Sequence, residues 1–331
     1  MAIKKLIYLL LAASLVFMMS CDSSTEPEEK PVDELALVTA VGDVYFTEYT
    51  TASGGVNTTI DAVFANLNDG DDTNNPFIID WRGSADYSVK HIKGAVNLAL
   101  GDLVAKVNDG TIPTDKLIVN VCYSGQTASV ATATLNLLGF DATNLKFGMC
   151  SVSSDPNFIP KSNNWANQIA SDEYVLNKTD EGTPADGSGF PVLSTGQKTA
   201  SDIIKANFAN VTAGWNVSFA NLIANPTDYF ILNYWGASDY MDIGHIEGAY
   251  QFTPSVSLQK AEMLNKLPKD QKIAVYCWTG QTSAQVTAYL RLLGYDAYSV
   301  LYGVNGFAFT ALPDGKPKYH EPTNDYSSIL E

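Results

Sequence analysis

The sequence predicts an α/β protein made of two similar domains, each a central parallel sheet flanked by helices. Short apolar runs alternate with helical patterns along the chain, which is typical of parallel strands joined by crossover helices. In addition, the segment Cys122-Tyr-Ser-Gly-Gln-Thr-Ala128 returns 155 residues later as Cys277-Trp-Thr-Gly-Gln-Thr-Ser283. The chain has 331 residues, enough for two domains of ordinary size, and it therefore contains two copies of one unit.

The chain begins with an apolar segment that we interpret as an export signal over residues 1–20. Two lysines precede the apolar core Leu6–Met19, which is shorter than the roughly 20 residues that a membrane-spanning helix needs. Ser20 and Cys21 resemble the cleavage site of bacterial lipoproteins, and this resemblance implies cleavage before Cys21 and lipid on its thiol. An ordinary secretory signal followed by an unrelated cysteine is the alternative.

The segment that follows, residues 21–36, is acidic and contains too few apolar side chains to form a core. We therefore expect a flexible tether, with acylated Cys21 holding the protein on a bacterial membrane, at the periplasmic face or at the cell surface. The formal net charge of −16 and the lack of a basic stripe argue against nucleic acid as a partner.

Domain 1 is predicted over residues 37–174. An apolar run over Phe77–Asp80 predicts its first buried strand, and a second run over Leu117–Val121 ends directly before Cys122. A helix is expected after the cysteine, and Gly139 should end it because glycine readily adopts the left-handed conformation. The apolar stripe of this helix consists of Ala131, Leu135 and Leu138.

The second half repeats this order. Residues 175–199, rich in Gly, Thr, Ser and Pro, predict a linker, residues 200–320 a second domain, and residues 321–331 a C-terminal tail. The segments that match domain 1 are Phe230–Tyr240, His245–Ala249, Ile273–Tyr276 and Leu293–Asp296.

Three short motifs follow one another in the first half: Asp80-Trp-Arg82, His91-Ile-Lys-Gly-Ala95 and the Cys-x-x-Gly-x-Thr loop at Cys122. Their counterparts keep this order in the second half. In this order both halves resemble the rhodanese (sulfurtransferase) domain. The resemblance covers nearly the whole chain apart from the tether and the linker. It implies that each loop cysteine accepts a sulfane sulfur, becomes a persulfide and passes the sulfur to a nucleophilic acceptor.

The resemblance also implies a structural role for Asp80 and Arg82, which form a buried ion pair in the family; Asn233 and Trp235 replace them in the second half. Threonine at the sixth loop position, at Thr127 and Thr282, is similar to the thiosulfate and mercaptopyruvate branches. The second and third loop positions carry no basic residue, which weakens the case for strong thiosulfate binding.

The residue types of the two loops suit this chemistry. A thiolate is the attacking species, and a helix N-terminus with converging backbone N–H groups stabilises it, so we expect exposed, ionised thiols. The loop threonines are expected to act as helix N-caps. We predict Cys122 and Cys277 as catalytic residues. The predicted substrate- or anion-binding residues are Tyr123, Ser124, Gly125, Gln126, Thr127, Trp278, Thr279, Gly280, Gln281 and Thr282.

The predicted function is that of a lipid-anchored, extracytoplasmic sulfurtransferase of the thiosulfate or 3-mercaptopyruvate type. Its expected donor is thiosulfate, a polysulfide or a mercapto compound, and its expected acceptor is a thiol or a cyanide-like nucleophile. We expect neither a cofactor nor a metal. The alternative is a non-catalytic sulfur carrier or scaffold that docks onto a protein partner, a membrane redox complex.

Three other hypotheses concern the cysteines. Phosphoryl transfer by a similar loop is disfavoured because Ala128 and Ser283 stand where a phosphatase needs arginine. The loop cysteines could instead be ordinary buried thiols. Cys150 is predicted near Cys122, as a resolving thiol for its persulfide or as its partner in a protective disulfide; an inert packed thiol is the alternative.

Overall fold

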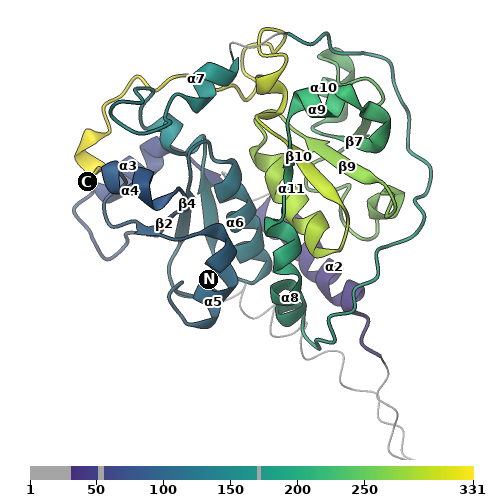
Figure 1. Cartoon of the computed structure of the whole chain (residues 1–331), viewed down its shortest axis with the longest axis horizontal. Helices are drawn as coiled ribbons and strands as arrows, with labels where there is room; N and C mark the ends of the chain where they lie inside the picture. Colours follow the sequence, from purple (N-terminus) through teal and green to yellow (C-terminus); the bar gives the residue numbers. More distant parts are fainter. Residues whose placement is uncertain (1–30, 51–55, 170–172) are drawn as a thin grey trace, which may run out of the picture.

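The computed structural model describes residues 31–50, 56–169 and 173–331. The predicted export signal, the lipidation site Cys21 and most of the predicted tether lie outside the described residues. Two five-stranded sheets are present, with strand orders β1-β5-β4-β2-β3 and β6-β10-β9-β7-β8, and all of their strand pairs are parallel (Figure 1). The prediction of two α/β domains with central parallel sheets is confirmed.

The first sheet consists of β1 (Asn57–Thr58), β2 (Phe77–Asp80), β3 (Val96–Asn97), β4 (Ile118–Val121) and β5 (Ala142–Leu145). Its helices are α3 (Ile60–Leu67), α4 (Ser84–Val89), α5 (Leu103–Asn108), α6 (Gln126–Leu137) and α7 (Asn164–Ile169). Short 3-10 turns occur at Leu100–Asp102 and Gly148–Ser151.

The second sheet consists of β6 (Asn216–Val217), β7 (Tyr229–Tyr234), β8 (Tyr250–Phe252), β9 (Lys272–Tyr276) and β10 (Ala297–Val300). Its helices are α8 (Ala200–Thr212), α9 (Phe219–Ala224), α10 (Ala237–Asp242) and α11 (Gln281–Leu292). Short 3-10 turns occur at Pro226–Asp228, Leu264–Lys266, Gly303–Gly306 and Ser327–Ile329. Within the described ranges, no helix combines the length and the apolar character needed to cross a membrane.

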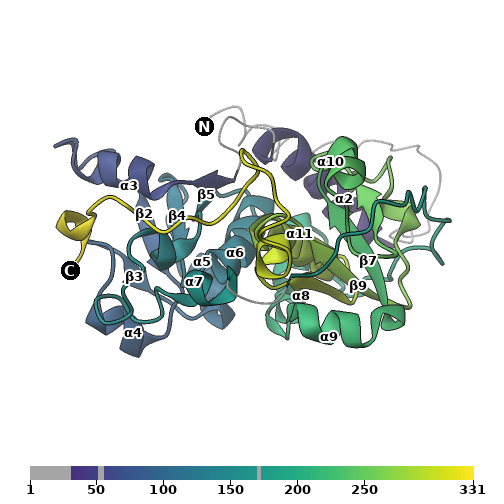
Figure 2. The same ribbon diagram turned by 90° about the horizontal axis from the view of Figure 1, so that it is seen from above.

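The helices that follow the two cysteines, α6 and α11, pack against each other and form the centre of the domain interface (Figures 1 and 2). Nearly every residue of both helices is buried, because each helix covers its own sheet on one side and the other helix on the other side. Polar side chains in α6 are satisfied locally: Thr132 and Thr134 donate to the carbonyls four residues earlier. As predicted, Gly139 and Gly294 follow the helices in the left-handed conformation.

The N-terminal helix α2 (Glu34–Val44) packs on α8 of domain 2, and the π-helical turn Tyr45–Tyr49 contacts α11 of domain 2 and α6 of domain 1 (Figure 1). This placement differs from the predicted boundaries. Asp33 caps α2 by accepting from Ala36 N, so the helix begins inside the segment predicted as a tether. The side chain of Glu34 accepts three hydrogen bonds from residues 195–196, which stand next to α8. Burial of the apolar face of α2 against α8 explains this placement.

The C-terminal tail crosses in the opposite direction and packs on domain 1 (Figure 2). Leu330 forms an isolated antiparallel bridge with Ile92, and the Tyr326 hydroxyl donates to Asp61 Oδ1 at 2.6 Å. The predicted linker between the domains follows the outer side of domain 2, where Asn177 forms a bridge with His245 (Figure 1). Each terminal segment therefore ties one domain to the other.

Candidate active site

Cys122 stands directly after β4, the middle strand of the first sheet, and its sulfur faces the backbone of its own loop. The N–H groups of Gly125 and Ala128 donate to Cys122 Sγ at 3.1 and 3.4 Å. Gly125 makes this curl of the loop possible, because its φ of +83° is strained for any residue with a side chain. The loop therefore holds sulfur within a ring of backbone donors at the N-terminus of α6.

The expectation of exposed thiols is wrong for both loops, because Cys122 and Cys277 are only 1% and 2% exposed. Burial raises the pKa of the Cys122 thiol, although the backbone N–H groups of the loop act in the opposite direction. Desolvation outweighs the helix terminus because a thiolate loses its hydration when it is enclosed by protein.

Cys277 occupies the same position after β9, but a pair of hydroxyl groups lies behind its sulfur. Ser283 N donates to Cys277 Sγ at 3.3 Å, and the thiol lies 3.6 Å from Ser283 Oγ. Ser283 Oγ in turn lies 2.8 Å from Ser299 Oγ on β10. Strand register makes Asn144 the equivalent of Ser299, and Ala128 the equivalent of Ser283, so the first loop lacks both hydroxyls. Sequence reasoning missed Ser299, which no motif marks.

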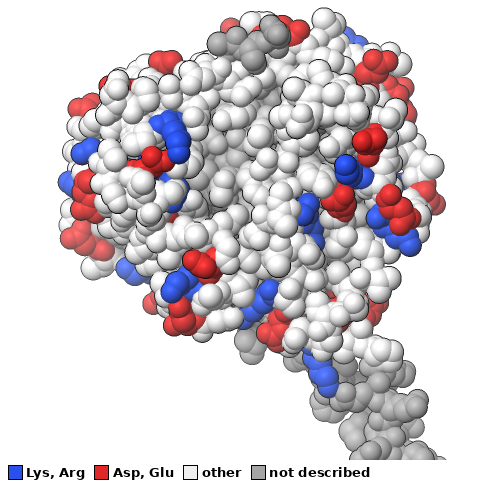
Figure 3. Space-filling view, viewed as in Figure 1, with Lys and Arg blue, Asp and Glu red and all other residues white. Residues whose placement is uncertain are grey.

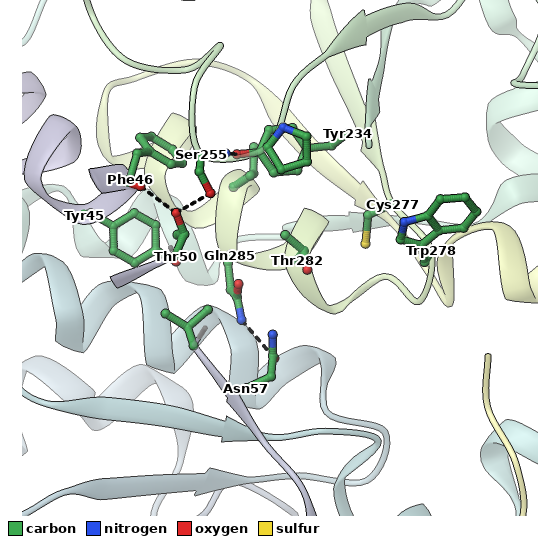
Figure 4. Close-up of a pocket in the computed structure, with 13 residues that line it drawn as sticks. Tyr45, Phe46, Thr50, Asn57, Tyr234, Ser255, Cys277, Trp278, Thr282 and Gln285 are labelled. Atoms are coloured by element: carbon green, nitrogen blue, oxygen red, sulfur yellow. Dashed lines mark hydrogen bonds between the residues drawn. The ribbon is translucent and has the colours of Figure 1, made fainter. Parts of the chain in front are cut away.

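A pocket of about 220 Å³ opens beside Cys277, at the junction of domain 2, strand β1 and the turn after α2. Figure 4 shows Cys277 and Trp278 at one end of this pocket and Tyr45 and Phe46 at the other. The predicted loop residue Thr282 also lines it.

The expectation that the loop threonines Thr127 and Thr282 are helix N-caps is wrong. Gly125 and Gly280 are the N-cap residues, and they provide no side-chain cap. The left-handed glycine caps each helix two residues before the predicted cap.

A lysine lies over the aromatic residue at the second position of each loop, and sequence reasoning missed both lysines. Lys161 Nζ is 4.8 Å from the ring centroid of Tyr123 and 2.7 Å from Asp86 Oδ2, and Tyr123 also donates to Asp86. In the second domain, Lys316 Nζ is 5.7 Å from the ring centroid of Trp278 and pairs with Asp239 at 2.5 Å. The two lysines are 155 residues apart, like the two cysteines, and this spacing could have revealed them.

The sequence was compared with models of known protein families. A family model described as "Rhodanese-like domain" matches residues 60–155 and 221–309, which together make up more than half of the chain. The chain belongs to the rhodanese-like family.

Among relatives, this rhodanese-like chain is 38% identical over 74 residues to the "Probable adenylyltransferase/sulfurtransferase MoeZ" of Mycobacterium tuberculosis. That match covers 22% of this chain and 19% of the relative. Among solved structures, a rhodanese-like domain protein from Staphylococcus aureus is 20% identical, with a TM-score of 0.26, over 28% of this chain and 86% of that one. A rhodanese-related protein from Thermoplasma volcanium is 17% identical, with a TM-score of 0.25, over 28% and 85%.

In this rhodanese-like pair, the side chains of the two loop glutamines reach across the domain interface, and their predicted role in substrate binding stays a prediction. Gln281 Oε1 accepts from Phe147 N and Asn144 Nδ2, both at 3.0 Å, in the other domain. Reciprocally, Gln126 Oε1 accepts from Tyr302 N at 2.7 Å. The N-termini of α6 and α11 meet at the interface, so these side chains reach across it. Within its own loop each glutamine donates to the hydroxyl of the third loop residue; these residues are Ser124 and Thr279.

The ion pair that the family resemblance implied is present and confirmed. Arg82 Nη2 lies 2.7 Å from Asp80 Oδ2, and both side chains are buried. In the second domain a neutral network replaces it: Asn233 Nδ2 donates to the Tyr276 hydroxyl at 2.9 Å, and Trp235 stacks on Trp278 with ring centroids 4.3 Å apart. Domain 2 thereby avoids placing two charges in its interior.

Cys150 is free, as are Cys122 and Cys277, the other two cysteines in the described part of the chain. Its backbone N–H donates to the Tyr123 carbonyl, so it is adjacent to the first loop, and its side chain packs against Trp165 and Tyr319. Burial raises the pKa of this thiol to about 12. The resolving role of Cys150 stays a prediction.

Proposed function

We propose that this member of the rhodanese-like family is a sulfurtransferase that moves sulfane sulfur through persulfides on Cys122 and Cys277. The observation that carries the proposal is that each thiol stands at the carboxyl end of a middle strand, inside a loop whose backbone N–H groups donate to sulfur. Such a loop stabilises the thiolate before transfer and the negatively charged outer sulfur after it.

The transfer proceeds in two displacements with balanced atoms. The cysteine thiolate attacks the outer sulfur of the donor, the donor's bond to that sulfur breaks, and the remainder of the donor leaves with the electron pair. A thiol or a cyanide-like nucleophile then attacks the outer sulfur of the persulfide, and the cysteine thiolate is released. Thiosulfate, polysulfides and mercapto compounds of the 3-mercaptopyruvate type, whose remainder can leave as an enolate, are the donor classes that this chemistry admits.

The cellular setting belongs to the same proposal. An acylated Cys21 would hold the protein on a bacterial membrane outside the cytoplasm, with the lipid bilayer as its partner. On the face seen in Figure 3, acidic and basic side chains of the described residues are intermixed and no basic stripe crosses it. This arrangement supports small sulfur compounds or a protein, and not nucleic acid, as partners.

Intact mass measured after polysulfide treatment tests the thiols. The full chain is expected to gain sulfur at both loops, Cys122→Ser and Cys277→Ser at one loop each, and the double variant at neither. Sulfur gain that neither substitution reduces contradicts the proposal. Repeated turnover of thiosulfate with cyanide, or of mercaptopyruvate with a thiol, separates an enzyme from a carrier, which loads once and releases sulfur only to its protein partner.

A further inference from the structure

The pocket beside Cys277 has walls without formal charge among the lining residues that the structure describes. Aromatic rings provide much of its surface, and they come from the turn after α2, from β7 and from the loop itself. These rings belong to Tyr45, Phe46, Tyr234 and Trp278. Lys316, which lies over the Trp278 ring, is paired with Asp239 at 2.5 Å, so its charge is compensated locally.

The polar groups of the pocket are largely occupied by one another. Thr50 Oγ1 lies 2.7 Å from Ser255 Oγ and donates to the Phe46 carbonyl, as the dashed lines in Figure 4 show. Ser255 N donates to the Tyr234 hydroxyl at 3.0 Å, and Gln285 Nε2 donates to Asn57 Oδ1 at 3.3 Å. These contacts engage the side chains of Thr50 and Gln285 within the protein, and the donors that remain in the lining are neutral.

Among the fully buried polar atoms of the lining residues, two have no hydrogen-bond partner. They are the Tyr45 hydroxyl and Gln285 Oε1, and both residues are 1% exposed. Burial raises the pKa of the Tyr45 hydroxyl, so it stays protonated and is available as a donor. One free neutral donor and one free neutral acceptor suit an uncharged polar group, such as a thiol.

The charge of a ligand decides whether it can enter such a site. Thiosulfate carries two negative charges and would lose its hydration in a pocket that supplies no cation, which is unfavourable. An organic molecule with a small apolar or aromatic body loses little hydration and covers the exposed rings. The backbone donors of the loop then have to stabilise only the one charge that develops on sulfur.

We propose that the Cys277 pocket selects small organic hydropersulfides, R–S–SH, whose R group is uncharged and apolar or aromatic, over thiosulfate. This inference rests on the proposed function. The Cys277 thiolate attacks the terminal sulfur, the S–S bond of the donor breaks, and RS⁻ leaves with the electron pair. RS⁻ then takes up one proton, equal to the one that the Cys277 thiol released when it ionised. The products are the Cys277 persulfide and R–SH, so no external oxidant or reductant is needed.

The test uses the full chain with Cys122→Ser, so that Cys277 is the remaining loop thiol. Benzyl hydropersulfide and thiosulfate are supplied separately at equal concentration, and the rate of sulfur gain at Cys277 is followed by peptide mass mapping. We expect benzyl hydropersulfide to load Cys277 at least about tenfold faster, which corresponds to about 1.4 kcal/mol. Equal loading, or faster loading by thiosulfate, overturns the selectivity alone. Loading by neither donor overturns the proposed function at Cys277.

A cation placed in the pocket provides the matched experiment. Thr282→Lys, at a half-buried lining position, should raise the rate of thiosulfate loading at Cys277 and leave or lower that of benzyl hydropersulfide. Val192→Lys, at an exposed linker position outside the pocket lining, adds the same charge and should leave both rates at Cys277 unchanged. Failure of Thr282→Lys to raise thiosulfate loading, in a variant that circular dichroism shows to be folded, contradicts the role of the neutral lining.

Discussion

The two cysteine loops have the same backbone, but different groups face their sulfur atoms. Around Cys122, the positions of the hydroxyl pair carry Ala128 and Asn144, and Asn144 is used for a hydrogen bond to the other domain. Around Cys277, Ser283 and Ser299 form a hydroxyl pair behind the thiol. Duplication therefore preserved the loop geometry and changed the polarity next to the reacting atom.

The entrances to the loops differ as well. Both have a lysine over an aromatic ring, but only the second loop borders the pocket that the N-terminal segment completes. The turn after α2 lines the pocket beside Cys277, and the Cys122 loop has no such contribution among the residues that line this pocket. The comparison teaches that the two thiols should react at different rates and prefer different donors.

The largest expected difference between the domains concerns their buried motifs. Asp80→Asn leaves Arg82 as an uncompensated buried charge and should lower the free energy of unfolding by about 3–5 kcal/mol. Asn stands naturally at the equivalent position 233, so domain 2 shows that the shape of the side chain is tolerated. Urea unfolding measures the effect. A loss below about 1 kcal/mol would show that domain 1 does not depend on its ion pair.

The reciprocal glutamines should also have unequal effects. Gln281→Ala removes the acceptor of Phe147 N and of one N–H of Asn144 Nδ2, whose other N–H still donates to Asn57, at a cost of about 1–3 kcal/mol for each lost hydrogen bond. Gln126→Ala leaves one such donor, Tyr302 N, so it should destabilise less. Urea unfolding of the two variants under the same conditions compares them. The reverse order of stability would contradict the interface that the two side chains form.

The hydroxyl pair predicts a smaller, kinetic difference. Ser283→Ala removes the hydroxyl that can donate to the Cys277 thiolate, and the rate of alkylation by iodoacetamide at neutral pH should fall about tenfold. The reciprocal change Ala128→Ser places a hydroxyl in the first loop and should raise the rate at Cys122. Peptide mass mapping assigns the alkylated residue. Unchanged alkylation rates in both variants would show that the hydroxyl does not affect the reactivity of the loop cysteines.

The smallest effect is a shift in pH dependence at Cys122. Because burial raises the pKa of this thiol, it ionises at a higher pH than a free cysteine, whose pKa is about 8.5. In Cys277→Ser, the alkylation rate of Cys122 should therefore still rise with pH where that of N-acetylcysteine has levelled off. The same shift means that the unfolded chain ionises first, so the stability contributed by the buried thiol declines as pH rises through this range. A profile that levels off below that of the free thiol contradicts this sign.

Much of this arrangement could be predicted from the sequence, because local physics determines it. An apolar run predicted strand β4, and an apolar stripe with helical spacing predicted helix α6. The glycine three residues after each cysteine, Gly125 or Gly280, has the left-handed conformation that the loop requires. Because the loop sequence at Cys122 is repeated at Cys277, the second loop was predicted in the same way as the first. The Asp80–Arg82 pair was expected only because its motif resembles that of a known family, and the structure contains it.

Only the tertiary structure decided what surrounds the two thiols. Burial of Cys122, the reach of Gln126 and Gln281 across the interface, and the contact of Ser299 with Ser283 all depend on how separate elements pack. The pocket at Cys277 requires a helix that precedes domain 1 in the chain to pack on domain 2. Long-range packing of this kind has no local sequence pattern, since the energy comes from surfaces that meet only after folding.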